Sequence, residues 1–313
     1  MSTSIRRFLS STSRDDPFSQ FGPILKPSVY NKTRPSGKQN QLSEFGPIQK
    51  KKSAQKDSKS SKEKFDQSRT VFPLICGSRP LCVPPLAVAA CSPVLRLPFT
   101  HSTDCPSVSR VLAATMSEQS RATLARWEAE KIALLGPDGF KKYKAELFSR
   151  GKTLHSILEN FLETRELPRP SDLDDEVSKR HLVSVSQVVR SVDRPLALES
   201  AVTHKKLGYS GIVDCVAVIG NTVTLIDWKT SEKVKNSAAA LYDNPLQVAA
   251  YVGAINSDPA YERLGTITHG AVVVIYNTGY PAMLHTFDQG QLEKYWKLWC
   301  ERLKMYKDHV KPK

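Results

Sequence analysis

Residues 196–228 read LALESAVTHKKLGYSGIVDCVAVIGNTVTLIDW, and the pattern of this stretch predicts the core of the fold. Three segments within it, 196–202, 209–219 and 222–228, have the character of β-strands, and the last two are rich in Val, Ile and Thr. Gly220-Asn221 separates the last two segments and favours a turn. The stretch therefore predicts a three-stranded β-meander.

Helical patterns lie before the meander. Ser117 is a candidate N-cap for a helix that ends at Gly136-Pro137, and ordered structure is expected from this helix onward. A second helical stretch follows. A third is expected from Gly151, where apolar residues recur at helical spacing.

The segments after the meander alternate between helix and strand. We expect a helix over 244–255, a strand over 269–277 and a short strand near 283–287. A closing helix should place four large apolar residues on its inner side, Leu292, Trp296, Trp299 and Leu303. This order of elements indicates an α/β domain.

Two acidic residues and a lysine stand on neighbouring predicted strands. Asp227 and Lys229 are two residues apart, so their side chains leave the same face of one strand. Asp214 lies on the preceding strand, where cross-strand pairing can bring two carboxylates within reach of one ion. Such oxygen ligands suit Mg²⁺ or Mn²⁺. The alternative is a structural Asp–Lys pair, but charged groups among apolar neighbours are costly unless they pair or bind a metal.

Other polar residues are weaker candidates. His155 and Glu159 are four residues apart and share one face of a predicted helix, although a lone helical His is more often a core residue. Gln247 and Tyr251 have the same spacing, which an ordinary helix-surface pair also shows. Glu199, on the first strand, is a secondary candidate like Glu159, because its phase on the strand is not fixed by the sequence.

Taken together, these residues resemble the RecB-like branch of the PD-(D/E)XK nucleases. That branch has a Gly-x-x-x-His helix, an Asp on the second strand, an Asp-x-Lys on the third and a Gln-x-x-x-Tyr helix. The matching residues occur here in the same order and are Gly151, His155, Asp214, Asp227, Lys229, Gln247 and Tyr251. The resemblance implies the PD-(D/E)XK nuclease fold, a central mixed β-sheet flanked by helices.

Longer stretches are similar to a group of animal mitochondrial exonucleases within this branch. They include PSVSRVL (106–112), IDWKTSEK (226–233) and DNPLQVAAY (243–251), and the similarity covers about residues 106–308. It implies a nuclease domain at 106–313, a metal-dependent single-strand-specific deoxyribonuclease that trims free ends and flaps of DNA during mitochondrial DNA replication and maintenance. The alternative is a DNA-binding or replisome-docking module with this fold and little catalysis.

The resemblance also implies roles for individual residues. Asp214 and Asp227 would hold Mg²⁺, for which Mn²⁺ would substitute, and His155 would be a further ligand or would orient one. Lys229 would position the attacking water or neutralise charge on the phosphate, and Gln247 with Tyr251 would orient the DNA strand or that lysine. Further candidate contacts to phosphates, which could equally be solvated, are Arg110, Lys152, Thr230, Ser231 and Lys233.

The N-terminal third differs in composition from the rest. Of the 45 Lys and Arg in a chain of net charge +14, 18 lie in residues 1–110, against 7 Asp and Glu there. Residues 1–14 contain three Arg, many hydroxyl groups and no acid, which is typical of a mitochondrial transit peptide and predicts the matrix as location. Residues 15–105 should be disordered or irregular. The sequence FGPI occurs in this region twice, by chance or as a docking motif for a mitochondrial replication protein.

The six cysteines lack the short CxxC spacing of zinc sites, so no zinc is expected. Iron–sulfur nucleases of this superfamily have three closely spaced cysteines near the C-terminus, where this chain has Cys300 alone, and no cluster is expected. No run of eighteen apolar residues occurs, which predicts no membrane insertion.

Overall fold

A computed structural model describes residues 93–99 and 105–310 of the chain. The predicted import segment 1–14 and both copies of FGPI lie outside the described residues. The same holds for the proline-rich stretch with Cys76, Cys82 and Cys91.

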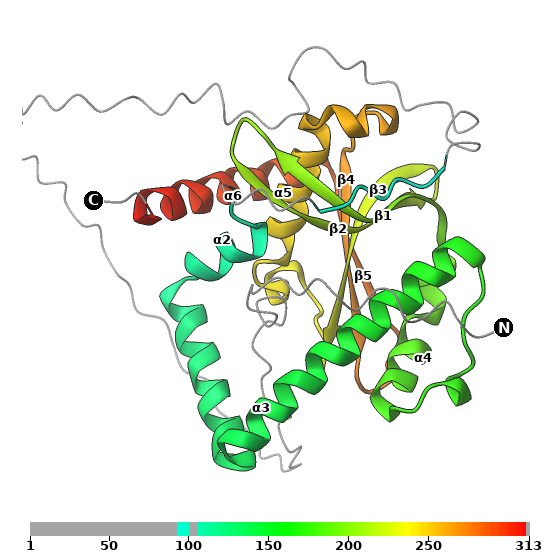
Figure 1. The fold of residues 1–313 in the computed structure, drawn as a ribbon, viewed down its shortest axis with the longest axis vertical. Helices are drawn as coiled ribbons and strands as arrows, with labels where there is room; N and C mark the ends of the chain where they lie inside the picture. Colours follow the sequence, from blue (N-terminus) through cyan, green and yellow to red (C-terminus); the bar gives the residue numbers. More distant parts are fainter. Residues whose placement is uncertain (1–92, 100–104, 311–313) are drawn as a thin grey trace, which may run out of the picture.

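The centre of the fold is a mixed five-stranded sheet in the order β1-β2-β3-β4-β5 (Figure 1). Strands β1 to β3 are antiparallel, which confirms the predicted meander. Strand β4 is parallel to β3 and antiparallel to β5. The strand bounds are Val192–His204, Tyr209–Ile219, Thr222–Ser231, His269–Tyr276 and Met283–Phe287.

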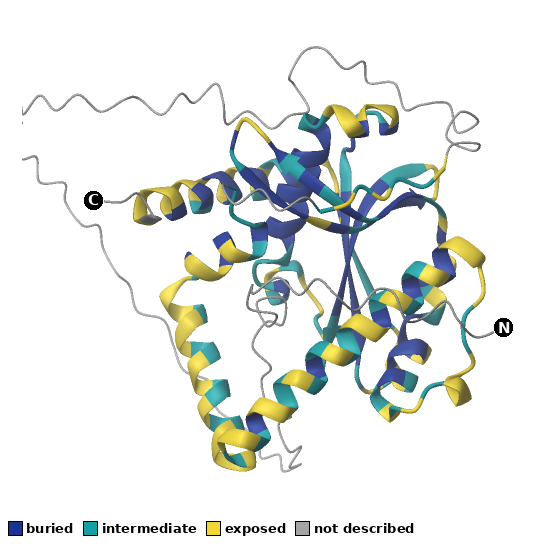
Figure 2. Cartoon of the chain, in the orientation of Figure 1, coloured by how far each residue is buried: buried dark blue, intermediate teal, exposed yellow. Residues whose placement is uncertain are grey.

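Helices cover both faces of the sheet (Figures 1 and 2). The second half of α3 and helix α4 pack on one face, and α5 and α6 pack on the other beside α2. The α-helices span Val108–Ala114 (α2), Glu118–Thr164 (α3), Glu176–Arg190 (α4), Asn244–Ser257 (α5) and Gln289–Val310 (α6). Among the described residues, short 3₁₀ helices span Pro170–Asp172 (η3), Ala238–Leu241 (η4) and Pro259–Leu264 (η5). Because a parallel step from β3 to β4 needs a crossover, α5 lies between them in the chain.

Helix α3 is bent into two arms that diverge in Figure 1. Ser117 caps its start by accepting a hydrogen bond from the Ser120 N–H, as predicted. Gly136 has non-helical angles (φ 71°, ψ 168°) and is followed by Pro137, so the predicted break is confirmed. The predicted new start at Gly151 is wrong, because the second arm runs through this residue without interruption.

The two faces of the sheet bury separate apolar clusters. Side chains of α3 and α4, such as Leu158 and Val185, pack with Ile226 and Trp228 on one face. On the other face α5 is buried on all sides, between the sheet and the aromatic residues of α6. The predicted inner side of the closing helix is confirmed, since Leu292, Trp296, Trp299 and Leu303 are all buried.

The α-helices α2 and α4 were not predicted. Helix α2 begins at the cap Ser107, ten residues before the expected start of order, and seven residues are too few for a clear period. Helix α4 is rich in Val and Ser, which favour other conformations, but burial of Val185 and Val189 against the sheet outweighs that preference.

Within the part of the chain that the structure describes, none of the helices has the length and apolar character that a membrane crossing requires.

Candidate active site

Strand pairing places three acidic residues side by side on β1, β2 and β3. The pairs Leu198–Cys215 and Ser200–Val213 flank Glu199 and Asp214, so these two carboxylates lie opposite one another. The ladder between β2 and β3 ends at the pair Cys215–Ile226, and Asp214 and Asp227 are the next residues of the two strands. Asp214 is therefore the central acid of the three.

Helix α3 adds His155 to this group. Its Nδ1 atom lies 3.5 Å from Glu199 Oε1 and 3.7 Å from Asp214 Oδ1. One ligand atom from each of these three residues lies within 4.8 Å of the others. The side chains are 23%, 35% and 13% exposed for His155, Glu199 and Asp214, so the cluster is reached by solvent.

Asp227 and Lys229 form a buried ion pair next to the cluster. Lys229 Nζ donates to Asp227 Oδ1 at 2.9 Å and lies 2.7 Å from Oδ2. At Oδ2 no donor has hydrogen-bond alignment, although the lysine charge is close. Asp227 is not in the group of three that lies within 4.8 Å. The Trp228 N–H between the two donates to Asp214 Oδ2 at 2.9 Å and fixes the orientation of that carboxylate.

The charges of the cluster shift one another's pKa values. Burial opposes protonation of His155, but Asp214 and the hydrogen bond to Glu199 outweigh it and raise its pKa to about 9. Burial raises the pKa of Asp214, against the opposing charges of His155 and Lys229. Burial likewise raises the pKa of Asp227 to about 6, although Lys229 opposes the shift. The site is therefore one where anionic charge is crowded and a cation is favoured.

The donor set fits a divalent cation. Ligands of an ion bound at about 2.1 Å in octahedral geometry lie about 3 Å apart when adjacent and about 4.2 Å apart when opposite. The separations of 3.5 and 3.7 Å around His155 Nδ1 fall within that range. Two carboxylates favour Mg²⁺ or Mn²⁺, and Mg²⁺ keeps several waters, so few protein ligands suffice.

Gln247 and Tyr251 lie on α5 close to the acids. Gln247 Nε2 donates to Tyr251 Oη at 3.2 Å, and both side chains are buried. Burial and, to a smaller extent, the charges of Asp227 and Asp214 raise the pKa of Tyr251, which keeps the phenol protonated. The ring fits against Gly211, where a Cβ atom would lie 2.5 Å from it. The Gln-x-x-x-Tyr pair is therefore part of the wall around the acids.

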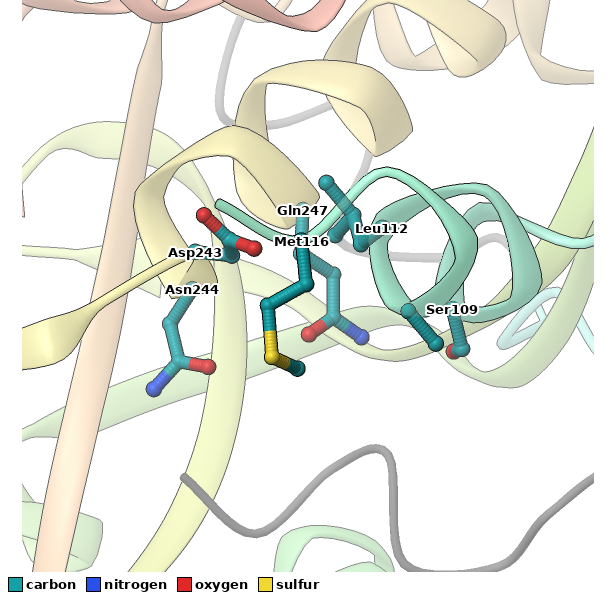
Figure 3. Close-up of a pocket in the computed structure, with 7 residues that line it drawn as sticks. Ser109, Leu112, Met116, Asp243, Asn244 and Gln247 are labelled. Carbon is teal, nitrogen blue, oxygen red and sulfur yellow. The ribbon is translucent and has the colours of Figure 1, made fainter. Parts of the chain in front are cut away.

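A small pocket lies beside Gln247, between α2 and the start of α5 (Figure 3). Its volume of about 40 Å³ holds a few water molecules and is too small for a nucleotide base. Arg302 fixes both walls, since it donates to Leu112 O at 2.8 Å and to Asp243 Oδ2 at 2.9 Å. The residues that line the pocket are Ser109, Leu112, Ala113, Met116, Asp243, Asn244 and Gln247.

The predicted phosphate contacts are in three places. Arg110 on α2 and Lys152 on α3 are exposed, and Lys152 Nζ lies 4.5 Å from the centre of the Phe148 ring. Thr230 and Ser231 end β3 and are partly buried. Ser231 Oγ donates to Lys233 O at 2.7 Å and accepts from its N–H, so this serine shapes the turn.

Two features of the site have no clear sequence signal. The inclusion of Glu199 follows from a positive φ of 40° that breaks the alternation of β1. Glu159 does not join the cluster, because Arg96 pairs with it from residues 93–99, sixty-three positions away. Long-range pairs of this kind are invisible to spacing rules.

Known proteins resemble the chain over this same region. Residues 112–305 match the family model described as the PD-(D/E)XK nuclease superfamily. Mitochondrial genome maintenance exonuclease 1 of Homo sapiens is 40% identical over 217 residues, which are 69% of this chain and 62% of that protein. The proteins of the same name from Mus musculus and Xenopus tropicalis are 37% and 42% identical over 222 and 202 residues.

Those two alignments cover 71% and 64% of this chain, and 64% and 57% of the relatives. The chain thus matches less than two thirds of the length of each of these relatives. The family match confirms the resemblance inferred from the motifs.

Proposed function

The chain belongs to the PD-(D/E)XK nuclease superfamily, and from this premise we propose that it is a metal-dependent exonuclease acting on single-stranded DNA. The observation that carries the proposal is the cluster of His155, Glu199 and Asp214 within 4.8 Å, beside the buried pair of Asp227 and Lys229. The relatives' names support exonuclease action and genome maintenance in mitochondria.

Mg²⁺ is the proposed cation, with Mn²⁺ as a substitute. Asp214, Glu199 and His155 hold it in this proposal, and Asp227 is the further carboxylate on the side of β3. When bound, the cation polarises the scissile phosphate and lowers the pKa of water. His155 must be neutral at its ligating nitrogen, and a bound cation favours this form because it repels the proton.

Lys229 acts on the reacting groups directly. Its ammonium group is held by Asp227 and is pre-oriented, so it is able to position the attacking water or to neutralise charge on the phosphoryl oxygens. In the reaction the water oxygen forms a bond to phosphorus while the bond from phosphorus to the leaving oxygen breaks. Donors that are already in place contribute most to such a step.

The substrate is proposed to be a single strand or flap with a free end. Gln247 and Tyr251 orient the strand from α5, while Arg110, Lys152, Thr230, Ser231 and Lys233 contact phosphates. Contacts of this kind position a strand and do not read its sequence. Cleavage should therefore be largely independent of base sequence.

We also propose that the protein acts in the mitochondrial matrix, with residues 1–14 as its import signal and FGPI as a contact for replication proteins. The composition of residues 1–14 and the names of the relatives support this location.

Purified protein and end-labelled DNA test the activity. Single-stranded DNA should be shortened from an end with Mg²⁺ or Mn²⁺ and should stay intact with EDTA. Duplex DNA without free single strands and single-stranded RNA of equal length serve as comparison substrates. Binding of DNA without shortening, under all metal conditions, would instead favour a DNA-binding module.

Asp227→Ala is the matched test of the site, and Asp174→Ala is its control. Asp174 is an acid in the loop before α4, outside the cluster. Loss of cleavage in the first variant alone supports the proposed site, whereas equal rates for both variants would contradict it.

A further inference from the structure

Residues 93–99, here called the edge segment, run alongside β1 and are drawn in cyan in Figure 1. Leu95 N–H donates to Leu196 O at 2.9 Å, and Leu198 N–H donates to Leu95 O at 3.0 Å. These are bonds of a parallel ladder. The segment therefore covers the edge of the sheet that β1 would otherwise expose.

The ladder loses its register at Glu199. In a regular parallel ladder Leu97 would accept from the Ser200 N–H, two residues beyond Leu198. Instead, the Ala201 N–H donates to Leu97 O at 2.9 Å, and the Leu97 N–H donates to Ser200 Oγ at 2.9 Å. Strand β1 thus contains one extra residue relative to the edge segment, which is a β-bulge.

The bulge puts Glu199 in an unusual conformation. Its φ of 40° is unfavourable for a residue with a Cβ atom and persists only where the surroundings impose it. Tyr261 contacts the two residues that follow Glu199. Its Oη lies 2.6 Å from Ser200 Oγ and donates to Ala201 O at 2.6 Å. The edge segment and Tyr261 therefore hold the backbone on both sides of Glu199.

Arg96 connects the same segment to α3. Its guanidinium pairs with Glu159 and lies 2.7 Å from Glu163 Oε1. Glu159 is one helical turn beyond His155 on the same face of α3. Seven residues thus bind both the strand that carries Glu199 and the helix that carries His155.

We propose that the edge segment is a positioning element for the cation ligands, in which Arg96 sets the distance between His155 on α3 and Glu199 in the bulge of β1. The inference rests on the proposed function, since these residues are ligands only if the protein binds a cation there. Without the segment, β1 loses the hydrogen bonds to Leu95 and Leu97 on the two sides of Glu199, and α3 loses its charged contact to the sheet edge. The ligands would then be further apart and more mobile, and metal affinity would fall.

The test uses the full chain with Arg96→Met, which keeps the aliphatic stem and removes the charge. Titration calorimetry with Mn²⁺ alone should show affinity at least about tenfold weaker than in the parent, the usual result of losing a residue that orients ligands. Saturating Mn²⁺ should restore most of the cleavage rate, because the ligands and Lys229 remain. Arg169→Met is the matched control, since Arg169 forms a surface pair with Asp172 and is 82% exposed.

Thermal unfolding without metal shows whether the variant is folded. If Arg96→Met does not fold, Arg96→Lys decides, because lysine keeps the charge but cannot contact both glutamates with one planar group. Mn²⁺ affinity equal to that of the parent in the folded variant overturns the positioning role. A parent whose Mn²⁺ binding is absent or is unaffected by Asp214→Asn contradicts the proposed function itself, which is a different result.

Discussion

At the residue scale, the pair of Asp227 and Lys229 is unusual because both side chains are buried, at 2% and 7% exposed. A buried ion pair gains little over apolar residues of the same shape, and removal of one partner leaves an uncompensated charge. The raised pKa of Asp227, about 6, shows that its anionic form is already disfavoured by burial. A pair of this kind therefore indicates a role in function and not in stabilising the fold.

Lys229→Ala should lower the rate of cleavage by about 10²- to 10³-fold, the usual loss when a preorganised donor is removed. The substitution removes a cation beside Asp227 and Asp214, so affinity for Mn²⁺ should be equal or higher. Single-turnover cleavage of labelled DNA and calorimetric Mn²⁺ titration measure the two quantities.

Asp227→Ala is the comparison, because it removes a carboxylate and should weaken both metal binding and cleavage. If Lys229→Ala cleaved DNA at the parent's rate, the assignment of this lysine to the reaction would be wrong.

His204 provides a pH-dependent contribution to stability away from the site. It is buried against Trp296 and Tyr209, accepts a hydrogen bond from the Leu207 N–H at its Nδ1, and has a pKa lowered to about 4 by burial. In the unfolded chain a histidine has a pKa of about 6.5. Between about pH 4 and about pH 6.5 the unfolded state therefore binds more protons than the folded state. Stability from this residue is present above about pH 6.5 and is lost as the pH falls toward 4.

The expected loss over this range is about 3 kcal/mol, at about 1.4 kcal/mol for each unit of pKa difference. His204→Gln removes the titrating group and can keep an acceptor for the Leu207 N–H. Urea unfolding at pH 7 and pH 4.5 should therefore show a smaller difference for the variant than for the parent. An unchanged difference would mean that His204 is not responsible.

Single residues of the site differ in how readable they are from sequence. Asp227 and Lys229 follow from the two-residue period of a regular strand, and Asp214 from its neighbour in the hairpin. Glu199 could be named only as a candidate, because the bulge breaks the period that would give its direction. The role of Arg96 depends on contacts to a helix more than sixty residues away.

At the element scale, α5 is the helix that links the core to the site. One side packs on the sheet, another on α6, and Gln247 and Tyr251, one helical turn apart, lie close to the acids. Gly253 at its second half touches Trp296, where a Cβ atom would lie 2.0 Å from the ring. The same helix thus contributes residues to the core and residues to the wall of the site.

Gly253→Ala should separate these two roles by destabilising the fold. Because Trp296 is fully buried and cannot move away, overpacking should cost about 1–3 kcal/mol. Chemical denaturation measures the loss, and the folded fraction should cleave DNA at close to the parent's rate. A variant as stable as the parent would show that α5 and α6 shift apart easily.

Gly211→Ala should have the opposite effect, with a larger loss of cleavage than of stability. Its Cβ atom would meet the Tyr251 ring at 2.5 Å, so the ring must move away from its present position beside the acids. Cleavage should fall while the stability changes less than in Gly253→Ala, because the tyrosine lies at the site wall. Parent-like cleavage in a folded protein would remove Tyr251 from the list of residues that orient the strand.

The start and the break of α3 have strong local signals and were predicted, whereas α4 depends on tertiary burial and was not. The cap Ser117 and the break at Gly136 are read directly from residue type. The residues of α4 favour other conformations by themselves, and the helix forms because Val185 and Val189 are buried against the sheet.

At the scale of the whole molecule, the site forms where elements from both faces of the sheet meet. Helix α3 contributes His155 from one face, and α5 contributes Tyr251 from the other, with the acids on the strands between. Tyr143 Oη also donates to Glu232 at 2.7 Å, which ties the second arm of α3 to the end of β3. The order of helices and strands could be predicted from the sequence. The meeting of α3, α5 and the strands at one site could not, because it depends on tertiary packing.

The N-terminal residues should determine where in the cell the protein acts. Residues 1–14 contain Arg6, Arg7 and Arg14 with apolar and hydroxyl side chains and no acid, a composition typical of segments that direct mitochondrial import. The full chain fused to a fluorescent reporter should enter mitochondria, and replacement of these three arginines by glutamine should leave it in the cytosol. The purified variant should cleave DNA at the parent's rate, because the proposed catalytic residues all lie beyond residue 150.

Replacement of Lys50, Lys51 and Lys52 by glutamine is the matched control, because it removes the same charge from the basic region outside the proposed signal. If import depends on the signal, this control should still enter mitochondria. Import lost equally in both variants would show that overall basic charge is responsible. Cytosolic retention of the parent would contradict the assignment of residues 1–14, since a basic, acid-free segment that functions as a signal must act in its native context.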